Sequence, residues 1–207
     1  MPRKRVVIFI SGGGSNMETL IRAAQAPDYP AEIVAVFSDK AQAGGLAKAQ
    51  AAGINTYIYT RKDYASKDAH EDAILEKLAE IAPDIICLAG YMRLLSGRFI
   101  APYTGRILNI HPSLLPLFPG LHTHQRALDA GMKLAGCTVH LVTEGMDEGP
   151  ILAQGAVAID TGDTAETVAA RVLIAEHQLY PLALCRFAGD AKPENHDICA
   201  TQALISV

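Results

Sequence analysis

Apolar residues in this chain gather into short unbroken runs that alternate with segments of helical spacing. The runs at 6–10, 31–38 and 84–89 are mostly apolar, as is typical of strands buried on both faces of a sheet. A short run at 107–108 is stopped soon afterwards by proline, as at the end of a buried strand. Three further runs complete a set of seven predicted strands, at 56–59, 135–142 and 151–158.

The segments between these strands repeat apolar residues at the three- and four-residue spacing of helices. Because strand and helix alternate, we expect a doubly wound α/β fold, with a mostly parallel sheet and helices on both faces. Residues 1–188 are expected to form one domain, followed by a polar tail at 189–207. The predicted helices are a segment through Met17, Leu20 and Ile21, then 46–52, 70–81, 125–129, and a long helix from a capping-box-like start at 163–166 to about 187.

The stretch Asn109-Ile-His-Pro-Ser-Leu-Leu-Pro116 directly follows the run at 107–108. With strand alternation, Asn109 and His111 point to the same side of the sheet. They also lie at the carboxyl end of a strand, where open α/β sheets bind ligands. An amide that donates hydrogen bonds and an imidazole that shuttles protons would then stand together. The alternative is a capped strand whose histidine is an ordinary hydrogen-bonded core residue.

A glycine turn, Ser11-Gly-Gly-Gly-Ser-Asn16, connects the first strand to the first helix. Glycines let the backbone approach a ligand, and the free N–H groups of the helix favour an anion, so this turn resembles a phosphate cradle. It lacks the lysine of a P-loop. Gly12, Gly14 and Asp39 loosely fit a dinucleotide fingerprint, but Met17 stands where glycine is needed. A single phosphate therefore fits better than a pyrophosphate, and the alternative is a tight turn without a ligand.

Two further loops carry side chains suited to a site. The segment 90–96 leaves the strand at 84–89 and is largely apolar. It either lines a pocket for a flat organic group or packs as ordinary core. The loop 143–150 carries Glu144, Asp147 and Glu148 together with two glycines, Gly145 and Gly149. Its carboxylates are either solvated turn residues or include one that meets His111, because loops on a rigid scaffold commonly carry function.

Composition narrows the class of protein. The chain has 207 residues, a net charge of -4 and no long basic run, which argues against a nucleic-acid scaffold. The run at 6–10 is too short for a signal peptide or a membrane span. The four cysteines show no paired metal spacing, so we expect reduced thiols in a cytoplasmic protein. No metal site is expected either, because no diagnostic ligand spacing is present among His111, His122, His124 and His140.

Five motifs occur together in this order: GGGSN at 12–16, AGYMRLL at 89–95, NIHPSLLP at 109–116, PGLHTH at 119–124 and MDEGP at 146–150. Over about residues 5–188 they resemble the phosphoribosylglycinamide formyltransferase family. The resemblance implies a Rossmann-like formyltransferase domain over 1–188, with the ribonucleotide phosphate in its amino-terminal half and the folate in its carboxyl-terminal half. The implied activity is transfer of formyl from 10-formyltetrahydrofolate to the amine of glycinamide ribonucleotide, in purine synthesis and without a metal.

The resemblance also implies roles for individual residues. Its catalytic residues correspond here to Asn109, His111 and Asp147. The expected partners are small molecules only, with no nucleic acid or membrane, and the chain is expected to be a monomer or a homodimer. The implied ribonucleotide site is Gly14, Ser15, Asn16, Pro112 and Glu176. The implied folate site is Lys67, Met92, Arg93, Leu94, Leu95, Asn109 and Glu144.

The implied reaction explains these residue types. Attack of an amine on the formyl carbon creates a tetrahedral oxyanion, to which Asn109 can donate a hydrogen bond. Loss of such a donor typically costs on the order of 100-fold in rate. A protonated His111 stabilises the same charge and can supply a proton to the departing folate nitrogen. Asp147, if it lies within reach, favours that protonated imidazole through its opposite charge.

Three positions depart from the family pattern. Gly13 stands where asparagine is frequent, which we expect to alter only the stiffness of the turn. Lys67 replaces an arginine found in some members, so the positive charge is kept but a bidentate grip on a carboxylate is lost. Glu148 replaces a glycine beside the catalytic aspartate, which bears on the backbone geometry of that loop.

Three other functions compete with this interpretation. A formyltetrahydrofolate deformylase would carry a regulatory domain, for which the chain leaves no room before Val6. A methionyl-tRNA formyltransferase would continue into a further carboxyl-terminal domain. It would also carry an arginine-rich variant of the residues that follow the SLLP motif at 113–116. A nucleotide-binding or folate-binding module without turnover would leave Asn109, His111 and Asp147 without a role. The sequence favours none of these three.

Overall fold

The computed structural model describes residues 2–189. Its seven strands are β1 (Lys4–Ile10), β2 (Ala31–Ser38), β3 (Asn55–Ile58), β4 (Ile85–Leu88), β5 (Ile107–His111), β6 (Leu134–Leu141) and β7 (Ile151–Ala158). They form one sheet in the order β3-β2-β1-β4-β5-β6-β7. β1 pairs in parallel with β2 and β4, and β2 with β3, whereas β6 and β7 are antiparallel. The prediction of a mostly parallel seven-stranded α/β fold is confirmed.

The helices are α1 (Ser15–Ala24), α2 (Gly44–Ala51), α3 (Lys67–Ile81), α4 (Gly97–Ile100), α5 (Thr123–Asp129) and α6 (Ala165–Gly189), with 3₁₀ turns at Arg61–Asp63 and Ala101–Tyr103. α3 begins earlier than predicted because the Ser66 hydroxyl accepts a hydrogen bond from the Ala69 N–H at 3.0 Å and caps the helix. α4 was missed, since four residues cannot show an apolar period. Its only signal is Ser96, which caps it in the same way.

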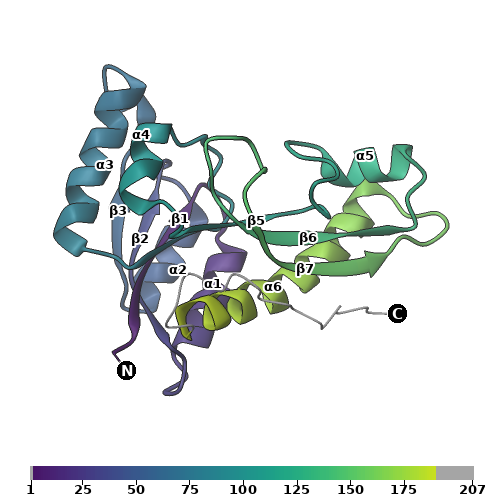
Figure 1. The fold of residues 1–207 in the computed structure, drawn as a ribbon, viewed down its shortest axis with the longest axis horizontal. Coiled ribbons are helices and arrows are strands. Elements are labelled where there is room, and N and C mark those ends of the chain that lie inside the picture. The colour runs from purple at the N-terminus through teal and green to yellow at the C-terminus, as the bar shows by residue number, and fades with distance from the viewer. Residues whose placement is uncertain (1, 190–207) are drawn as a thin grey trace. The chain divides into compact units, whose positions relative to one another are not determined.

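The chain forms two compact units, divided between Leu108 and Asn109. In the amino-terminal unit, Figure 1 shows α3 and α4 on one side of the strands and α1 and α2 on the other. Phe9 of β1 lies at the centre of the core. Its ring stacks on Phe37 at 5.0 Å between centroids and meets the edges of Tyr91 and Phe99 at 5.2 and 6.2 Å.

The strand register brings three loops of this unit to one edge. Ile10, the last residue of β1, lies opposite Ser38, the last residue of β2. Phe9 lies opposite Leu88, the last residue of β4. The residues that follow these strands, starting at 11, 39 and 89, therefore leave the sheet side by side.

In the carboxyl-terminal unit, α6 packs along the antiparallel pair β6–β7, and α5 packs against α6 (Figure 1). The buried stripe of α6 includes Val168, Val172, Leu179 and Tyr180. Of the predicted tail at 189–207, only Gly189 belongs to the described residues, and it ends α6. None of the helices described is both long and apolar enough to cross a membrane.

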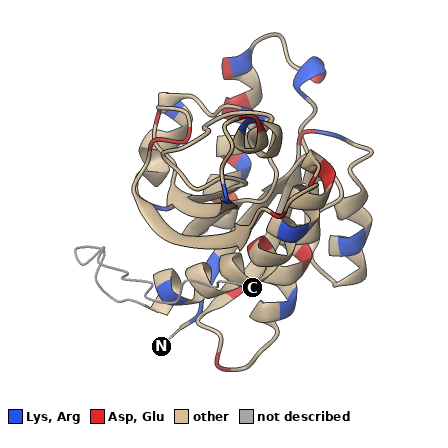
Figure 2. Cartoon of the chain, turned by 90° about the vertical axis from the view of Figure 1, so that its right-hand side faces the viewer, with Lys and Arg blue, Asp and Glu red and all other residues tan. Residues whose placement is uncertain are grey.

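Charged residues of the two signs are interspersed along the helices in Figure 2. Some pair between neighbouring helices, as Lys48 of α2 does with Glu18 of α1 at 2.8 Å. Of the four cysteines, Cys137 and Cys185 are free thiols, Cys87 is buried in β4, and Cys199 lies outside the described residues.

Candidate functional site

His111 ends β5 and is buried, with a hydrogen-bond acceptor at each ring nitrogen. Its Nδ1 lies 3.4 Å from Asp147 Oδ2, and its Nε2 lies 3.2 Å from the carbonyl oxygen of Phe118. A neutral imidazole has one N–H and satisfies only one acceptor, whereas an imidazolium has two. The two acceptors around His111 thus match in number the two N–H groups of an imidazolium.

Asp147 lies in the loop between β6 and β7 and is brought to His111 by its own backbone and by a neighbouring loop. Its φ of 56° is in the left-handed region, which aspartate tolerates better than most residues. The Gly120 N–H donates to Asp147 Oδ2 at 2.9 Å. The carboxylate is thus oriented by a backbone donor on one side and faces His111 on the other. Backbone outliers of this kind concentrate at functional sites.

Glu148 and the two glycines of this loop are held by close contacts. A Cβ on Gly149 would overlap the Leu141 carbonyl, so this glycine is fixed by close packing against β6 and is not a free hinge. A Cβ on Gly145 would meet the carboxylate of Glu148, which folds back over it. Glu148 therefore lies against its own loop, and Asp147 is the carboxylate that reaches His111.

Asn109 lies two residues before His111 on β5. It contacts His140 of β6, which in turn lies near Asp147. The Asn109 Nδ2 lies 3.1 Å from His140 Nε2, and His140 Nδ1 lies 3.0 Å from the Leu141 carbonyl. The carbonyl can only accept, so Nδ1 carries the proton and Nε2 accepts from Asn109. This bond uses one amide hydrogen of Asn109, orients the group and leaves the second hydrogen for a ligand.

Burial lowers the pKa of His140, and the neighbouring His111 lowers it further. The Leu141 hydrogen bond and the Asp147 charge, whose Oδ1 lies 3.7 Å from Nε2, act in the opposite direction. The lowered pKa agrees with the neutral ring that the hydrogen bonds require. His140 was missed as a functional residue in the sequence. Its only signal is polar residues at 138 and 140, on one face of an otherwise apolar strand.

The lowered pKa of His140 predicts a pH dependence of stability. Below pH 6.5, its ordinary value, the unfolded chain takes up a proton at this position before the folded chain does. The free energy of unfolding should therefore fall as the pH drops from 6.5 to the lower pKa of the folded state. His140→Gln should flatten this acid limb in denaturant titrations between pH 7.5 and 5. The exposed-site control His122→Asn should keep the wild-type slope, and an unchanged slope in His140→Gln would contradict the assignment.

Thr138, the second polar residue of β6, holds the chain that leaves β5. Its hydroxyl donates to the Ser113 carbonyl at 2.7 Å and accepts from the Leu115 N–H at 3.0 Å. Gln154 of β7 donates to the same hydroxyl and to the Leu115 carbonyl. The Leu115–Pro116 peptide bond is cis. The hydrogen bonds of Thr138 and Gln154 fix the exit of β5 and, with it, the orientation of His111.

The next part of this loop, residues 117–122, is held by Arg126 of α5. The Arg126 guanidinium donates to the Pro119 and Leu121 carbonyls and lies over the ring of Phe118, 5.5 Å from its centroid. This one side chain therefore organises the loop that supplies the Phe118 carbonyl to His111 and the Gly120 N–H to Asp147.

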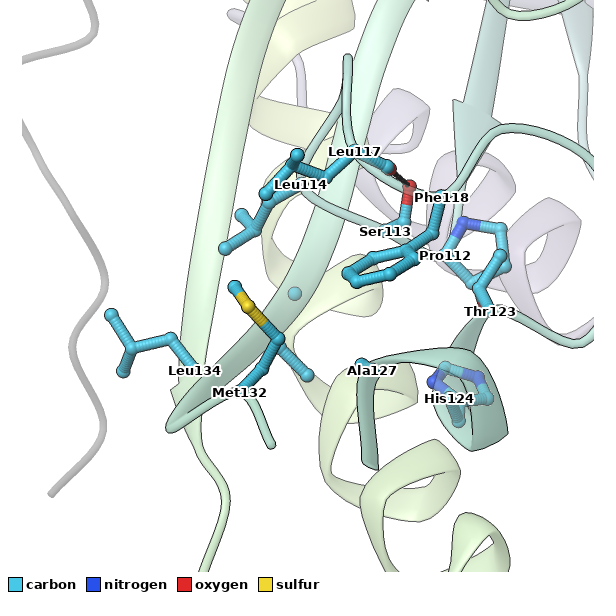
Figure 3. A pocket seen from close by; sticks show the side chains of 12 residues that line it. Pro112, Ser113, Leu114, Leu117, Phe118, Thr123, His124, Ala127, Met132 and Leu134 are labelled. Atoms are coloured by element: carbon cyan, nitrogen blue, oxygen red, sulfur yellow. Dashed lines mark hydrogen bonds between the residues drawn. The ribbon is translucent and has the colours of Figure 1, made fainter. Parts of the chain in front are cut away.

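A small cavity of about 10 Å³ lies under this loop (Figure 3). Ser113, whose hydroxyl donates to the Leu117 carbonyl at 2.7 Å, and Phe118 line it from the loop, and His124 lines it from α5. Burial lowers the pKa of His124, and the His111 ring lowers it further. The volume suffices for about one water molecule, so this cavity is no substrate site.

In the amino-terminal unit, the glycine turn closes tightly against α2. Gly14 has a φ of 71°, and a Cβ there would lie 2.9 Å from the Gly45 Cα. The Gly45 N–H donates to the Gly12 carbonyl at 3.0 Å. The turn then leads directly into α1, which begins at Ser15 with Asn16 buried. Gly12 and Gly13 border an open hollow of about 650 Å³ that Lys40 and Lys62 also line. The cradle predicted from the sequence thus has a fixed backbone and cations nearby.

The segment 90–95 of the same unit exposes two of its apolar side chains. Met92 and Leu94 are each 63% exposed, so they are not ordinary core residues. Arg93, Leu95 and Lys67 line a hollow of about 360 Å³ with them. Lys67 begins α3, and its Nζ lies 3.7 Å from Glu71 Oε1. Five of the predicted folate residues, Lys67 and 92–95, therefore border one hollow.

The remaining predicted residues belong to the carboxyl-terminal unit. Glu144 is exposed in the 143–150 loop, and Pro112 is partly buried beside the small cavity. Glu176 is buried on α6, where its charge adds to burial in raising the pKa of Cys137 to about 12. Among the residues described, no three histidine, cysteine, aspartate or glutamate side chains are grouped as metal ligands.

Comparison with known proteins supports the motif-based interpretation. A family model described as "Formyl transferase" matches residues 4–184. The phosphoribosylglycinamide formyltransferase of Escherichia coli K12 is 42% identical over 195 residues, which cover 94% of this chain and 92% of that one. A crystal structure of the Brucella melitensis phosphoribosylglycinamide formyltransferase shares 81% identity, covers 92% of this chain and 98% of its own, and has a TM-score of 0.88.

A second kind of relative is much longer. The trifunctional purine biosynthetic protein adenosine-3 of Bos taurus is 48% identical over 201 residues, which are 96% of this chain. This chain spans only 20% of that relative's length.

Proposed function

The chain belongs to the formyl transferase family, and from this premise we propose that it transfers the formyl group of 10-formyltetrahydrofolate to the amine of 5'-phosphoribosylglycinamide. The products are N-formylglycinamide ribonucleotide and tetrahydrofolate, in purine biosynthesis. The observation that carries the proposal is the cluster at the end of β5. There His111 Nδ1 lies 3.4 Å from Asp147 Oδ2, and Asn109 lies two residues before His111 on the same strand.

The cluster suits each step of this reaction. The substrate amine attacks the formyl carbon, and Asn109 donates its second amide hydrogen to the oxyanion that develops. The imidazolium of His111 stabilises the same charge. The bond to the folate nitrogen then breaks, that nitrogen gains a proton and the attacking amine loses one, and His111 carries protons between them. Asp147 keeps the positive ring in place. In this structure the Phe118 carbonyl oxygen is the hydrogen-bond partner of His111 Nε2. A substrate oxygen that bonds to Nε2 would displace this carbonyl.

We assign the substrates to the residues expected from the motifs. Gly14, Ser15 and Asn16 hold the ribonucleotide phosphate, and Pro112 and Glu176 contact the rest of that substrate. The exposed apolar side chains of Met92 and Leu94 support a role in binding the flat folate, together with the residues Lys67, Arg93, Leu95, Asn109 and Glu144. We further propose a single domain over 1–188, a cytoplasmic location, and a monomer or homodimer.

The phosphate offers a test of the ribonucleotide assignment. Wild-type protein should bind glycinamide ribonucleotide far more tightly than the nucleoside that lacks the phosphate, by roughly 100-fold or more, because hydrogen bonds to a charged group are each worth about 1.5–3 kcal/mol. Gly14→Ala must shift the backbone at Gly45 and should lose much of this discrimination. Calorimetric titration of both ligands into both proteins measures it. Equal affinity of the wild type for the two ligands would contradict a phosphate cradle.

A further inference from the structure

Asp39 directly follows β2 and was singled out in the sequence because its spacing from the glycine turn resembles a dinucleotide fingerprint. In such folds the acidic residue binds a ribose hydroxyl. Here the side chain is buried, with 3% of the residue exposed, and both of its oxygens have protein partners. The Ser11 hydroxyl donates to Oδ1 at 2.6 Å, and the Arg93 Nε–H donates to Oδ2 at 2.7 Å. A ribose would have to displace both partners, so Asp39 has another role.

These contacts join two segments to which substrate binding has been assigned. Ser11 opens the phosphate turn, and its hydroxyl also accepts the Met92 N–H at 2.9 Å. The Ser11 N–H donates to the Gly90 carbonyl at 3.1 Å. Asp39 therefore anchors the segment 90–95 twice, directly through Arg93 and indirectly through Ser11 and Met92.

The anchoring matters because the residues after Tyr91, which itself packs on Phe9, have little packing of their own. Met92 and Leu94 are largely exposed on either side of Arg93, so burial of their side chains does not order this stretch. A loop that is already ordered in the free protein binds its ligand more tightly, because no conformational entropy is lost in ordering it when the ligand binds. A buried carboxylate with two hydrogen bonds holds one backbone geometry better than a surface ion pair would.

We propose that Asp39 is a positioning residue that preorganises the segment 92–95 for the formyl-folate and ties it to the phosphate turn. This inference rests on the proposed function, because it takes residues 92–95 as part of the folate site. It assigns Asp39 no contact with either substrate.

Asp39→Asn tests the inference with minimal change of shape. The amide oxygen can still accept from Ser11, but the amide N–H₂ would face the Arg93 donor, so only the Arg93 arm is broken. The acid-to-amide change Glu80→Gln, at an exposed residue of α3, is the matched control. We expect Asp39→Asn to raise the KM for 10-formyltetrahydrofolate and the Kd of 5-formyltetrahydrofolate about tenfold, a change of about 1.4 kcal/mol. The KM for the ribonucleotide and the kcat at saturation should stay within about twofold of wild type.

Ser11→Ala removes the second link, which runs from Asp39 through the Ser11 hydroxyl to the Met92 N–H. Its effect can be measured without substrate. It removes the acceptor of the Met92 N–H, so hydrogen exchange at that amide should speed up by about tenfold or more while amides of β1 remain protected. It should raise the KM of both substrates. Unchanged folate affinity in Asp39→Asn, an equal rise in Glu80→Gln, or unchanged Met92 exchange in Ser11→Ala would overturn the inference. Wild-type protein that transfers no formyl group would instead refute the proposed function, and the exchange experiment would still test the anchoring.

Discussion

His111→Ala should leave a folded protein whose kcat for formyl transfer is lower by roughly 10²–10⁴-fold, the range that a positioned general acid–base group supplies. The ring ends β5 with acceptors at both nitrogens, and no other described histidine lies as close to Asp147. Steady-state kinetics with both substrates at saturation measures the loss, and thermal unfolding verifies the fold.

The matched control for this variant is His122→Asn. His122 is exposed with a φ of 57°, a conformation that asparagine adopts readily, so this change should leave kcat within about twofold of wild type. A kcat in His111→Ala equal to that of the control would remove His111 from the mechanism.

Asp147→Asn should show the second largest effect, a fall in kcat on the order of 10²-fold, with the fold retained. Asparagine tolerates the left-handed backbone at this position, and its amide oxygen can still accept the Gly120 N–H. What is lost is the negative charge 3.4 Å from His111. An imidazolium formed at His111 during the reaction would then lack its counter-charge, which is why the rate should fall.

The neighbouring acid provides the comparison. Glu148 is adjacent in sequence, exposed and folded over Gly145, so Glu148→Gln should change kcat little. Rates measured from pH 5.5 to 9 for both variants separate the two carboxylates. If Asp147→Asn and Glu148→Gln both keep the wild-type kcat across this range, the ion pair with His111 has no part in catalysis.

Most of the fold could be predicted from the sequence because buried strands and amphipathic helices leave strong local patterns. β2 and β7 have the same bounds as the predicted runs at 31–38 and 151–158. α3 starts three residues before the predicted residue 70, because Ser66 caps it. α4 has no such pattern, since it is too short. Register is a tertiary property, which is why the meeting of Ser11, Asp39 and Arg93 at one edge could not be foreseen from sequence spacing.

The candidate site was predictable in part for the same reason. Alternation on one strand placed Asn109 and His111 together, and glycines marked the loop that carries Asp147. The Phe118 carbonyl and the Gly120 N–H leave no trace in the sequence, because every residue carries such groups. His140 has a chemical identity, but its role depends on β6 lying beside Asn109.

The most direct test of the account offers one formyl donor to three acceptors. Purified protein with 10-formyltetrahydrofolate is assayed with glycinamide ribonucleotide, with water alone and with methionyl initiator tRNA, and the formylated product and released tetrahydrofolate are quantified. The account predicts rapid formylation of the ribonucleotide, slow hydrolysis and no formyl-methionyl-tRNA. Rapid hydrolysis without ribonucleotide product, formylation of the tRNA, or binding of both substrates without turnover would each contradict it.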